Sequence, residues 1–174
     1  MMERIVIRPF QENDPIPEIT RLLHDAYAPL AAMGLRYTAT HQDEEVTRRR
    51  LASGWAWVAE LEGEIVATVT LYQNPSGSDE CAWYGEPGVF SFGQFAVRAD
   101  IQGQGLGGRL IALLESEAAT RGARELALDT ADGAVHLIRW YEKLGFRFIE
   151  HVSWGNTNYR SVVLSKSLAV GDWH

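Results

Sequence analysis

Residues 102–108, Gln-Gly-Gln-Gly-Leu-Gly-Gly, form the segment whose residue types and spacing point most directly to chemistry. They stand between a predicted strand, residues 89–97, and a predicted helix with an apolar stripe that begins at Leu106 and includes Leu110. Glycines at the start of a helix let backbone N–H groups approach an anion, and the helix N-terminus favours negative charge. Each glycine also loses more entropy on folding than alanine, which makes a ligand-free role costly. The segment therefore predicts a loop that binds a pyrophosphate.

Two classes of enzyme use such a loop. The pattern Gly103-x-Gly105-x-x-Gly108 matches the dinucleotide-binding fingerprint, and Asp129 follows about 20 residues later at a predicted strand end. An NAD(P)-linked oxidoreductase is therefore one hypothesis. In that class the strand runs directly into the first glycine, whereas here residues 98–102 intervene. The context disfavours the oxidoreductase.

A second motif, residues 140–146 (Trp-Tyr-Glu-Lys-Leu-Gly-Phe), ends a predicted helix over 135–144. Residues 102–107 fit Gln-x-x-Gly-x-Gly, and residues 141–146 fit Tyr-Glu-x-x-Gly-Phe. In this order, with a helix and a strand between them, the two motifs resemble those of the GNAT acetyltransferases. The predicted element order resembles the family over nearly the whole chain, and residues 75–88 match it least.

The resemblance implies that acetyl-CoA is the cofactor and that its acetyl group passes to a primary amine by direct attack, without an acyl-enzyme. It places the pantetheine chain along the strand backbone and the pyrophosphate on the loop amides. The implied cofactor-binding residues are Phe95, Ala96, Val97, Gln102, Gly103, Gln104, Gly105, Leu106, Gly107 and Gly108. The sequence itself has no Gly-x-Ser-x-Gly elbow and no zinc-type spacing, so we predict no metal.

By the same resemblance, Tyr141 protonates the leaving thiolate. A phenol suits this task because its ordinary pKa, about 10, is not far above that of a thiol. The alternative is that Tyr141 only packs, since Leu137 and Leu144 share its helix face.

The base that accepts a proton from the amine is less clearly marked. Residues 89–94 carry no carboxylate, although many relatives have a glutamate there. A branch resembling the N-terminal acetylases of ribosomal proteins has a carboxylate twelve residues before the tyrosine, which corresponds to Asp129 here. Asp129 is therefore the predicted base. The alternatives are that Asp129 caps a helix or turn, a role for which Asp132 competes, or that Glu86, His151 or a water chain acts instead.

The acceptor pocket is expected between the first two predicted helices, the loop over 36–42 and the aromatic segment over 83–86. Aromatic rings with nearby carboxylates suit an amine through apolar contact and cation–π attraction. The alternative is that these rings merely cover the sheet. The predicted substrate-binding residues are Tyr37, Trp83, Tyr84 and Glu86. A polyamine, an aminoglycoside, an amino acid, a peptide N-terminus and a lysine side chain all remain open as acceptors.

These residues need a scaffold of alternating strands and helices, which predicts a mixed sheet with helices on both faces. We therefore expect an α/β (α+β) fold in a single domain, residues 1–174. The resemblance further implies a GNAT-like, mostly antiparallel sheet with one splayed parallel strand pair. The predicted strands are 3–8, 55–61, 64–72, 89–97, 126–129, 146–154 and 159–165, of which 3–8 and 55–61 show alternating apolar residues and 126–129 is a short buried strand.

The composition limits the classes of binding partner and the cellular compartment that we expect for this protein. The net charge of −7 argues against nucleic acid, which normally needs a basic face. No apolar run approaches the roughly 20 residues of a membrane helix, so we predict no membrane partner. A lone cysteine, Cys81, and the absence of a signal peptide favour the cytoplasm.

Assembly and catalytic competence remain open. The last predicted strand, 159–165, carries Val162 and Leu164 opposite Ser161 and Val163, so we expect both of its faces to be at least partly buried. Relatives often pair through this end of the sheet, so we expect a homodimer. A catalytically silent acyl-CoA-binding module of the same fold is the main functional alternative. The intact glycine loop and Tyr141 argue against it.

Overall fold

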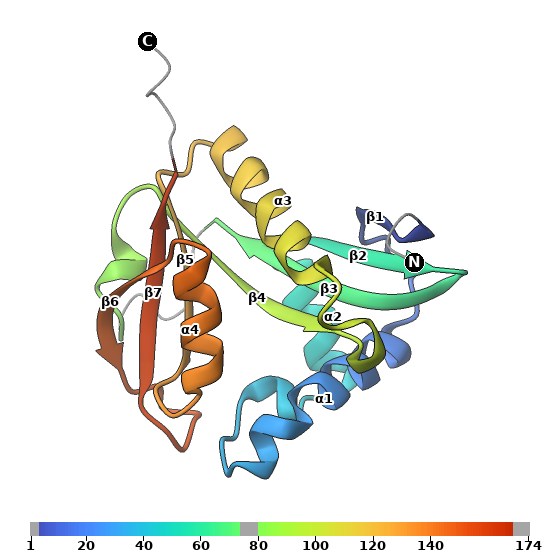
Figure 1. The fold of residues 1–174 in the computed structure, drawn as a ribbon, viewed down its shortest axis with the longest axis horizontal. Coiled ribbons are helices and arrows are strands. Elements are labelled where there is room, and N and C mark those ends of the chain that lie inside the picture. The colour runs from blue at the N-terminus through green and yellow to red at the C-terminus, as the bar shows by residue number, and fades with distance from the viewer. Residues whose placement is uncertain (1–3, 74–79, 169–174) are drawn as a thin grey trace. The chain divides into compact units, whose positions relative to one another are not determined.

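The computed structural model describes residues 4–73 and 80–168 (Figure 1). Their strands form a seven-stranded mixed sheet in the order β1-β2-β3-β4-β5-β7-β6. The strands are β1 (Val6–Pro9), β2 (Trp55–Leu61), β3 (Glu64–Tyr72), β4 (Val89–Val97), β5 (Glu125–Ala131), β6 (Arg147–Val152) and β7 (Ser161–Ser167). The α-helices are α1 (Ile16–Ala32), α2 (Glu44–Ala52), α3 (Leu106–Thr120) and α4 (Val135–Lys143).

The predicted fold class is confirmed, because the sheet is mostly antiparallel with one parallel pair, β4 and β5. The parallel pairing joins Val89, Phe90 and Ser91 to Glu125, Leu126 and Ala127. Splaying of this pair stays a prediction. The predicted bounds of β2, β3 and β4 are confirmed, and residue 3 of the first predicted strand lies outside the described residues.

The chain divides into two compact units. The first unit is Met1–Leu71 with Gly93–Leu110, and the second unit is Tyr72–Phe92 with Ile111–His174. Both β4 and α3 therefore contribute residues to each unit. A single domain stays a prediction, and each unit is described by itself below.

The first unit is built around the antiparallel hairpin β2–β3, with β1 paired antiparallel to β2. The hairpin turns at Glu62 and Gly63, whose φ angles are 52° and 83°. Two left-handed residues in succession are what a tight two-residue hairpin turn requires, and this is why glycine follows glutamate here. Helix α1 supplies much of the core. The buried core cluster comprises Ile19, Leu22, Leu23, Ala39, Leu51, Val58 and Ala96.

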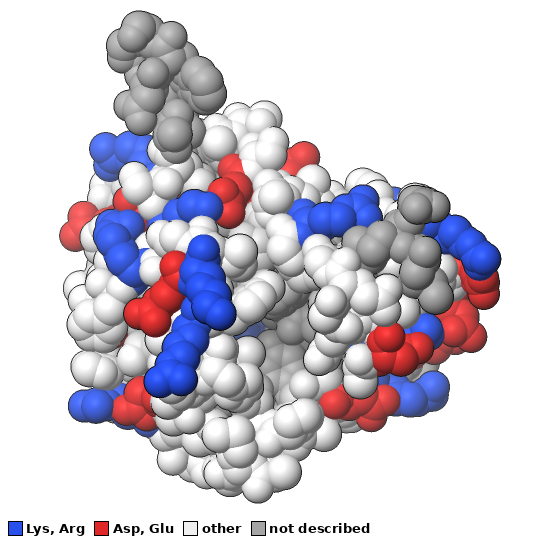
Figure 2. Space-filling model, viewed as in Figure 1, with Lys and Arg blue, Asp and Glu red and all other residues white. Residues whose placement is uncertain are grey.

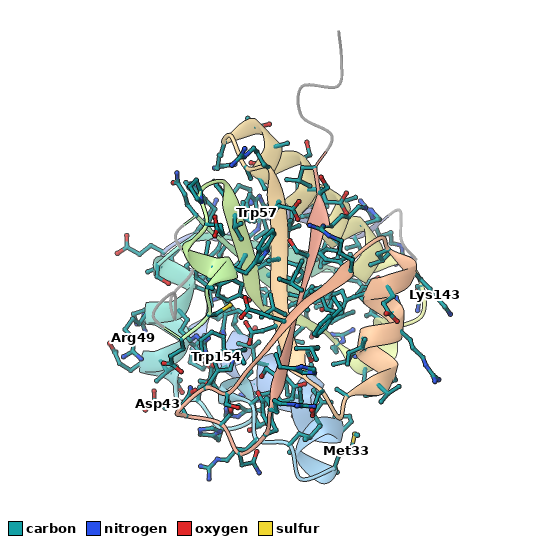
Figure 3. The ribbon with its side chains drawn as sticks, turned by 90° about the vertical axis from the view of Figure 1, so that its left-hand side faces the viewer. Met33, Asp43, Arg49, Trp57, Lys143 and Trp154 are labelled. Atoms are coloured by element: carbon teal, nitrogen blue, oxygen red, sulfur yellow. The ribbon has the colours of Figure 1, made fainter. Side chains whose placement is uncertain are left out.

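Helix α2 begins directly after Asp43. The Asp43 carboxylate accepts a hydrogen bond of 2.9 Å from the backbone N–H of Val46, the contact typical of an N-cap aspartate. Asp43 is labelled in Figure 3. Acidic residues occupy the first turn and Arg49 and Arg50 the last, complementing the helix dipole. Such a cap contributes about 1 kcal/mol to a helix with little apolar surface.

The second unit places β7 between β5 and β6, paired antiparallel to both. Residues 161–165 of β7 are all buried, which confirms the expectation that this strand is covered on both faces. Helix α4 covers one face of these strands (Figure 1). A second buried cluster comprises Cys81, Tyr84, Val89, Ala127, Val152 and Val163.

Candidate functional site

The glycine loop lies in the first unit, between a short 3-10 turn (Ala99–Ile101) and α3. Residues 102–105 are exposed, whereas Leu106 is buried and anchors the helix start. Gly103 and Gly105 have φ angles of 81° and 92°, a left-handed conformation that favours glycine. A Cβ atom added at Gly103, Gly105 or Gly108 would meet nothing within 4 Å, so the backbone there faces open space.

This geometry fits an anion. The first N–H groups of an α-helix have no carbonyl partner within the helix, and those of α3 follow directly on the exposed glycines. The pyrophosphate of a cofactor would therefore find backbone donors and room for close approach at residues 103–108.

Side chains brace the loop against the end of β4. The Gln102 side-chain amide donates to the Val97 carbonyl at 2.8 Å. The Arg98 guanidinium donates to Asp100 at 2.6 Å and to Glu64 on β3 at 2.9 Å. The Gln102 side chain thus holds the loop to the strand, and anion binding by the backbone amides of the loop stays a prediction.

The strand that enters this loop has an irregular interior. Gln94 has a φ angle of 52°, in the left-handed region that non-glycine residues rarely adopt, and is buried. It directly precedes the predicted pantetheine strand, in which Phe95 is half-buried and Ala96 and Val97 are buried. The left-handed Gln94 was not predicted from the sequence. Gly93 in a strand interior was the available signal, since such glycines often mark an irregularity.

Gln94 belongs to a buried polar network that the sequence analysis also missed. The Gln42 side-chain amide donates to the Gln94 side-chain oxygen at 2.9 Å and to the Thr47 hydroxyl at 2.8 Å. The Thr20 hydroxyl donates to Thr47 at 2.8 Å. His24 Nε2 lies 2.6 Å from the Gln42 carbonyl, and because a carbonyl only accepts, this nitrogen carries the proton. The network ties α1, α2 and the loop between them to β4.

Tyr141, the predicted acid, lies on α4 in the second unit and is buried. Its ring packs among three aromatic rings, with centroid distances of 5.0 Å to Trp140, 5.7 Å to Phe146 and 6.1 Å to Phe92. The ring therefore has a packing role, as the alternative interpretation holds. The same packing fixes the ring orientation, which a positioned acid requires, so the acid role stays a prediction.

Asp129, the predicted base, accepts two hydrogen bonds in the second unit. The Tyr84 hydroxyl donates to Oδ1 at 2.6 Å, and the Trp154 indole N–H donates to Oδ2 at 3.0 Å. The Tyr84 and Trp154 rings stack at 6.1 Å with 25° between their planes (Trp154 is labelled in Figure 3). The structure thus brings together two residues that the sequence analysis singled out, and adds Trp154.

Tyr84 remains a hydrogen-bond donor at neutral pH. Burial of the phenol, followed by the charge of the neighbouring Asp129 carboxylate, raises the pKa of Tyr84. A phenol that keeps its proton has one O–H to donate, and it donates to Asp129. Asp129 is exposed despite these contacts, so an incoming group can reach it.

The capping alternative for Asp129 is wrong. The N-cap of α4 is Ala134, which makes no side-chain cap. Asp129 lies inside β5, which runs on to Ala131 beyond the predicted strand end. Asp132 accepts a hydrogen bond of 2.9 Å from Arg160 instead of capping the helix.

The remaining predicted acceptor residues divide between the units. Tyr37 lies in the first unit, where its ring is 5.5 Å from that of Tyr27. Trp83 and Glu86 lie in the second unit, near Tyr84 in sequence, and Glu86 is exposed. The Trp83 ring is half-buried, and the Arg147 guanidinium lies 5.9 Å from its centroid. Packing of Trp83 against the second buried cluster accounts for its position without a role in acceptor binding, as the alternative interpretation holds.

Cys81 is buried and forms no disulfide. Burial is the main cause that raises the pKa of the Cys81 thiol, which disfavours the nucleophilic thiolate. Within residues 4–73 and 80–168, no group of three His, Cys, Asp or Glu side chains is arranged to hold a metal ion. No helix in this part of the chain is long and apolar enough to cross a bilayer.

Comparison with known proteins identifies the class. The profile of the Acetyltransferase (GNAT) family matches residues 16–146. The S-(2-succino)cysteine N-acetyltransferase of Bacillus subtilis (strain 168) is 32% identical over 132 residues, which cover 74% of this chain and 76% of that protein. The chain therefore belongs to the GNAT acetyltransferase family, and acetyl-CoA is its cofactor.

Solved structures share the fold. A GNAT family acetyltransferase from Elizabethkingia anophelis with acetyl-CoA bound is 22% identical, with a TM-score of 0.67 over 95% of this chain and 99% of that one. The ribosomal-protein-S18-alanine N-acetyltransferase from Escherichia coli is 17% identical, with a TM-score of 0.70 over 94% of each chain. Family membership favours the acetyltransferase over the NAD(P)-linked oxidoreductase.

Proposed function

We propose that this protein transfers the acetyl group of acetyl-CoA to a primary amine by direct attack, without an acyl-enzyme. The observation that carries the proposal is the exposed loop with left-handed Gly103 and Gly105, which opens α3 and is braced to the end of β4. Acetyl-CoA supplies an acetyl group activated as a thioester. The buried Cys81, with its raised pKa, is unsuited to carry that group.

Each step needs a group of this chain. Residues 95–97 of β4 offer backbone partners to the pantetheine chain, and the amides of residues 103–108 bind the pyrophosphate. The Tyr141 hydroxyl gives its proton to the leaving sulfur. Asp129 takes one proton from the substrate ammonium and later releases it to solvent. The second proton, which the nitrogen loses after attack, returns to Tyr141, so the protons balance over the reaction. Tyr84 and Trp154 fix the Asp129 carboxylate in one orientation.

For the acceptor, we propose amino acids with a free α-amine as the first class to test. The 32% identical relative from Bacillus subtilis is named for acetylating S-(2-succino)cysteine, an amino acid with additional carboxylates. An acceptor of that kind needs cationic partners. The predicted pocket loop carries one such cation, the exposed Arg36, whose Nε donates to His41 Nδ1 at 3.5 Å.

A screen of amines with a thiol-detecting assay tests the function. We expect thiol release from acetyl-CoA to depend on the added amine, and the product amine to gain one acetyl group by mass spectrometry. Reactions without amine measure background hydrolysis. Binding of acetyl-CoA with no transfer to any amine class would favour the catalytically silent module.

Replacing Asp129 by asparagine is expected to lower kcat by roughly 10²–10⁴-fold at neutral pH, the usual contribution of a positioned base. The rate should recover as pH rises, because an amine that is already deprotonated needs no base. The measurement is a pH–rate profile with a verified acceptor.

The matched control is Asp132→Asn, which removes a carboxylate of the same unit that pairs with Arg160. It should change the profile little, since that pair is largely exposed. A loss in Asp129→Asn that stays constant across pH would assign Asp129 a structural role instead.

We also propose a cytoplasmic homodimer. The buried, free Cys81 suits a reducing compartment. Since β7 is internal, β6 is the edge strand at this end of the sheet, and its Phe148 is 52% exposed. Sedimentation that finds only a 19.4 kDa species at micromolar concentration would contradict the dimer.

We propose no nucleic-acid partner. On the face drawn in Figure 2, basic and acidic side chains are interspersed. The net charge of −7 points the same way, because a nucleic-acid-binding face is normally basic.

A further inference from the structure

Gln94 holds an unfavourable backbone conformation inside the first unit. Its φ angle of 52° is left-handed, and left-handed residues other than glycine persist only where the surroundings impose them. The turn residue Glu62, also at 52°, lies at an exposed hairpin tip, whereas Gln94 is buried in a strand. Buried strain of this kind is concentrated at functional sites, so the contacts that impose it have a candidate role.

The side chain of Gln94 supplies one such contact. Its oxygen accepts a hydrogen bond of 2.9 Å from the Gln42 side-chain amide, and the two residues are 3% and 4% exposed. A hydrogen bond shielded from water is strong, and an unpaired amide left behind by its loss would be costly. Gln42 and Gln94 therefore form a buried latch on the left-handed residue.

Gln42 is itself held in place by hydrogen bonds to residues of α1 and α2. Gln42 also donates to Thr47 of α2, Thr47 accepts from Thr20 of α1, and the Gln42 carbonyl accepts from His24 of α1. Gln42 directly precedes Asp43, which caps α2. Two helices thus hold Gln42 in place while it holds β4.

We propose that Gln42 and Gln94 are positioning residues for acetyl-CoA binding. By keeping residue 94 left-handed, they set the direction of the peptide groups that follow, which belong to residues 95–97. The inference rests on the proposed binding of the pantetheine chain along these residues. It deepens that function by assigning part of the affinity for acetyl-CoA to the side chains of Gln42 and Gln94, which are not among the residues predicted to contact the cofactor.

The decisive experiment is calorimetric titration with acetyl-CoA of the wild type, Gln42→Leu and Gln94→Leu, each below its unfolding temperature. Loss of the latch should raise Kd about tenfold, corresponding to the loss of one buried hydrogen bond. The Michaelis constant for acetyl-CoA should rise more than kcat falls.

Two further variants keep the test informative if a leucine variant fails to fold. Gln94→Asn tolerates the left-handed conformation but shortens the side chain that reaches Gln42, so Kd should still rise. In Gln94→Gly, residue 94 can adopt the left-handed conformation without strain, but no side chain is left to bind Gln42 and keep it there. The Kd for acetyl-CoA should therefore rise, but less than in Gln94→Leu.

The matched control is Thr68→Val on β3. Thr68 is buried in the same unit, and its hydroxyl has no hydrogen-bond partner among the described residues, so valine should preserve Kd. Latch variants that bind acetyl-CoA as tightly as the wild type would overturn the proposal, even if their unfolding temperatures fell. A wild type that fails to bind acetyl-CoA would instead refute the proposed function.

Discussion

Replacing Tyr141 by phenylalanine is expected to lower kcat by roughly 10²–10⁴-fold while acetyl-CoA affinity changes little. The substitution removes the proton donor but keeps the ring that packs against Phe92, Trp140 and Phe146. A loss confined to kcat marks an interaction made mainly in the transition state. Steady-state kinetics with a verified acceptor and a titration with acetyl-CoA measure the two quantities separately.

Tyr72→Phe is the control for this experiment, because it deletes a tyrosine hydroxyl in the same unit but outside α4. It should leave kcat close to that of the wild type. Near-full kcat in Tyr141→Phe would reduce Tyr141 to a packing residue of the aromatic cluster. Thermal unfolding of both variants checks that the fold is kept.

Replacing Gly105 by valine is expected to weaken acetyl-CoA binding on the order of 100-fold, which corresponds to two lost hydrogen bonds to a charged group at about 1.5 kcal/mol each. At a φ angle of 92° a branched side chain is strained, and it would stand where the pyrophosphate must approach. Gly107→Val, in the first turn of α3, is expected to weaken binding because its branched side chain would also block the approach of the pyrophosphate.

Gly63→Val provides a closely matched control. Gly63 has a φ angle of 83°, and an added Cβ there, as at Gly105, meets nothing within 4 Å. Both variants therefore carry a similar conformational penalty, but Gly63 lies in the hairpin turn. Saturation at 100 times Kd stabilises a protein by about 2.7 kcal/mol, so thermal shifts report binding. A full acetyl-CoA shift in Gly105→Val would refute the role of the loop.

Local patterns predicted those parts of the fold that depend on neighbours in sequence. The hairpin β2–β3 follows from alternating apolar residues on either side of Glu62 and Gly63. The glycine loop could be predicted because its glycines and the start of α3 are adjacent in the chain. The sequence could not show that β5 extends to Ala131, because that end pairs with Ser161 of β7, far away in the chain.

Contacts between distant residues account for what the sequence missed at the site. Gln42 and Gln94 are 52 positions apart, and neither has a residue type that signals a role. Asp129 and Tyr84 were each singled out, but their hydrogen bond depends on a pairing 45 residues apart. Trp154 joins them only because the chain after β6 returns to β5.

The burial of Cys81 has a practical consequence for experiments on this protein. It is the one cysteine of the sequence, and its side chain is withdrawn from solvent. The native enzyme should therefore contribute little background to reagents that detect free coenzyme A. A cysteine introduced at an exposed position such as Gly155 would be the preferred target of a maleimide dye or spin label, with the native thiol left in place.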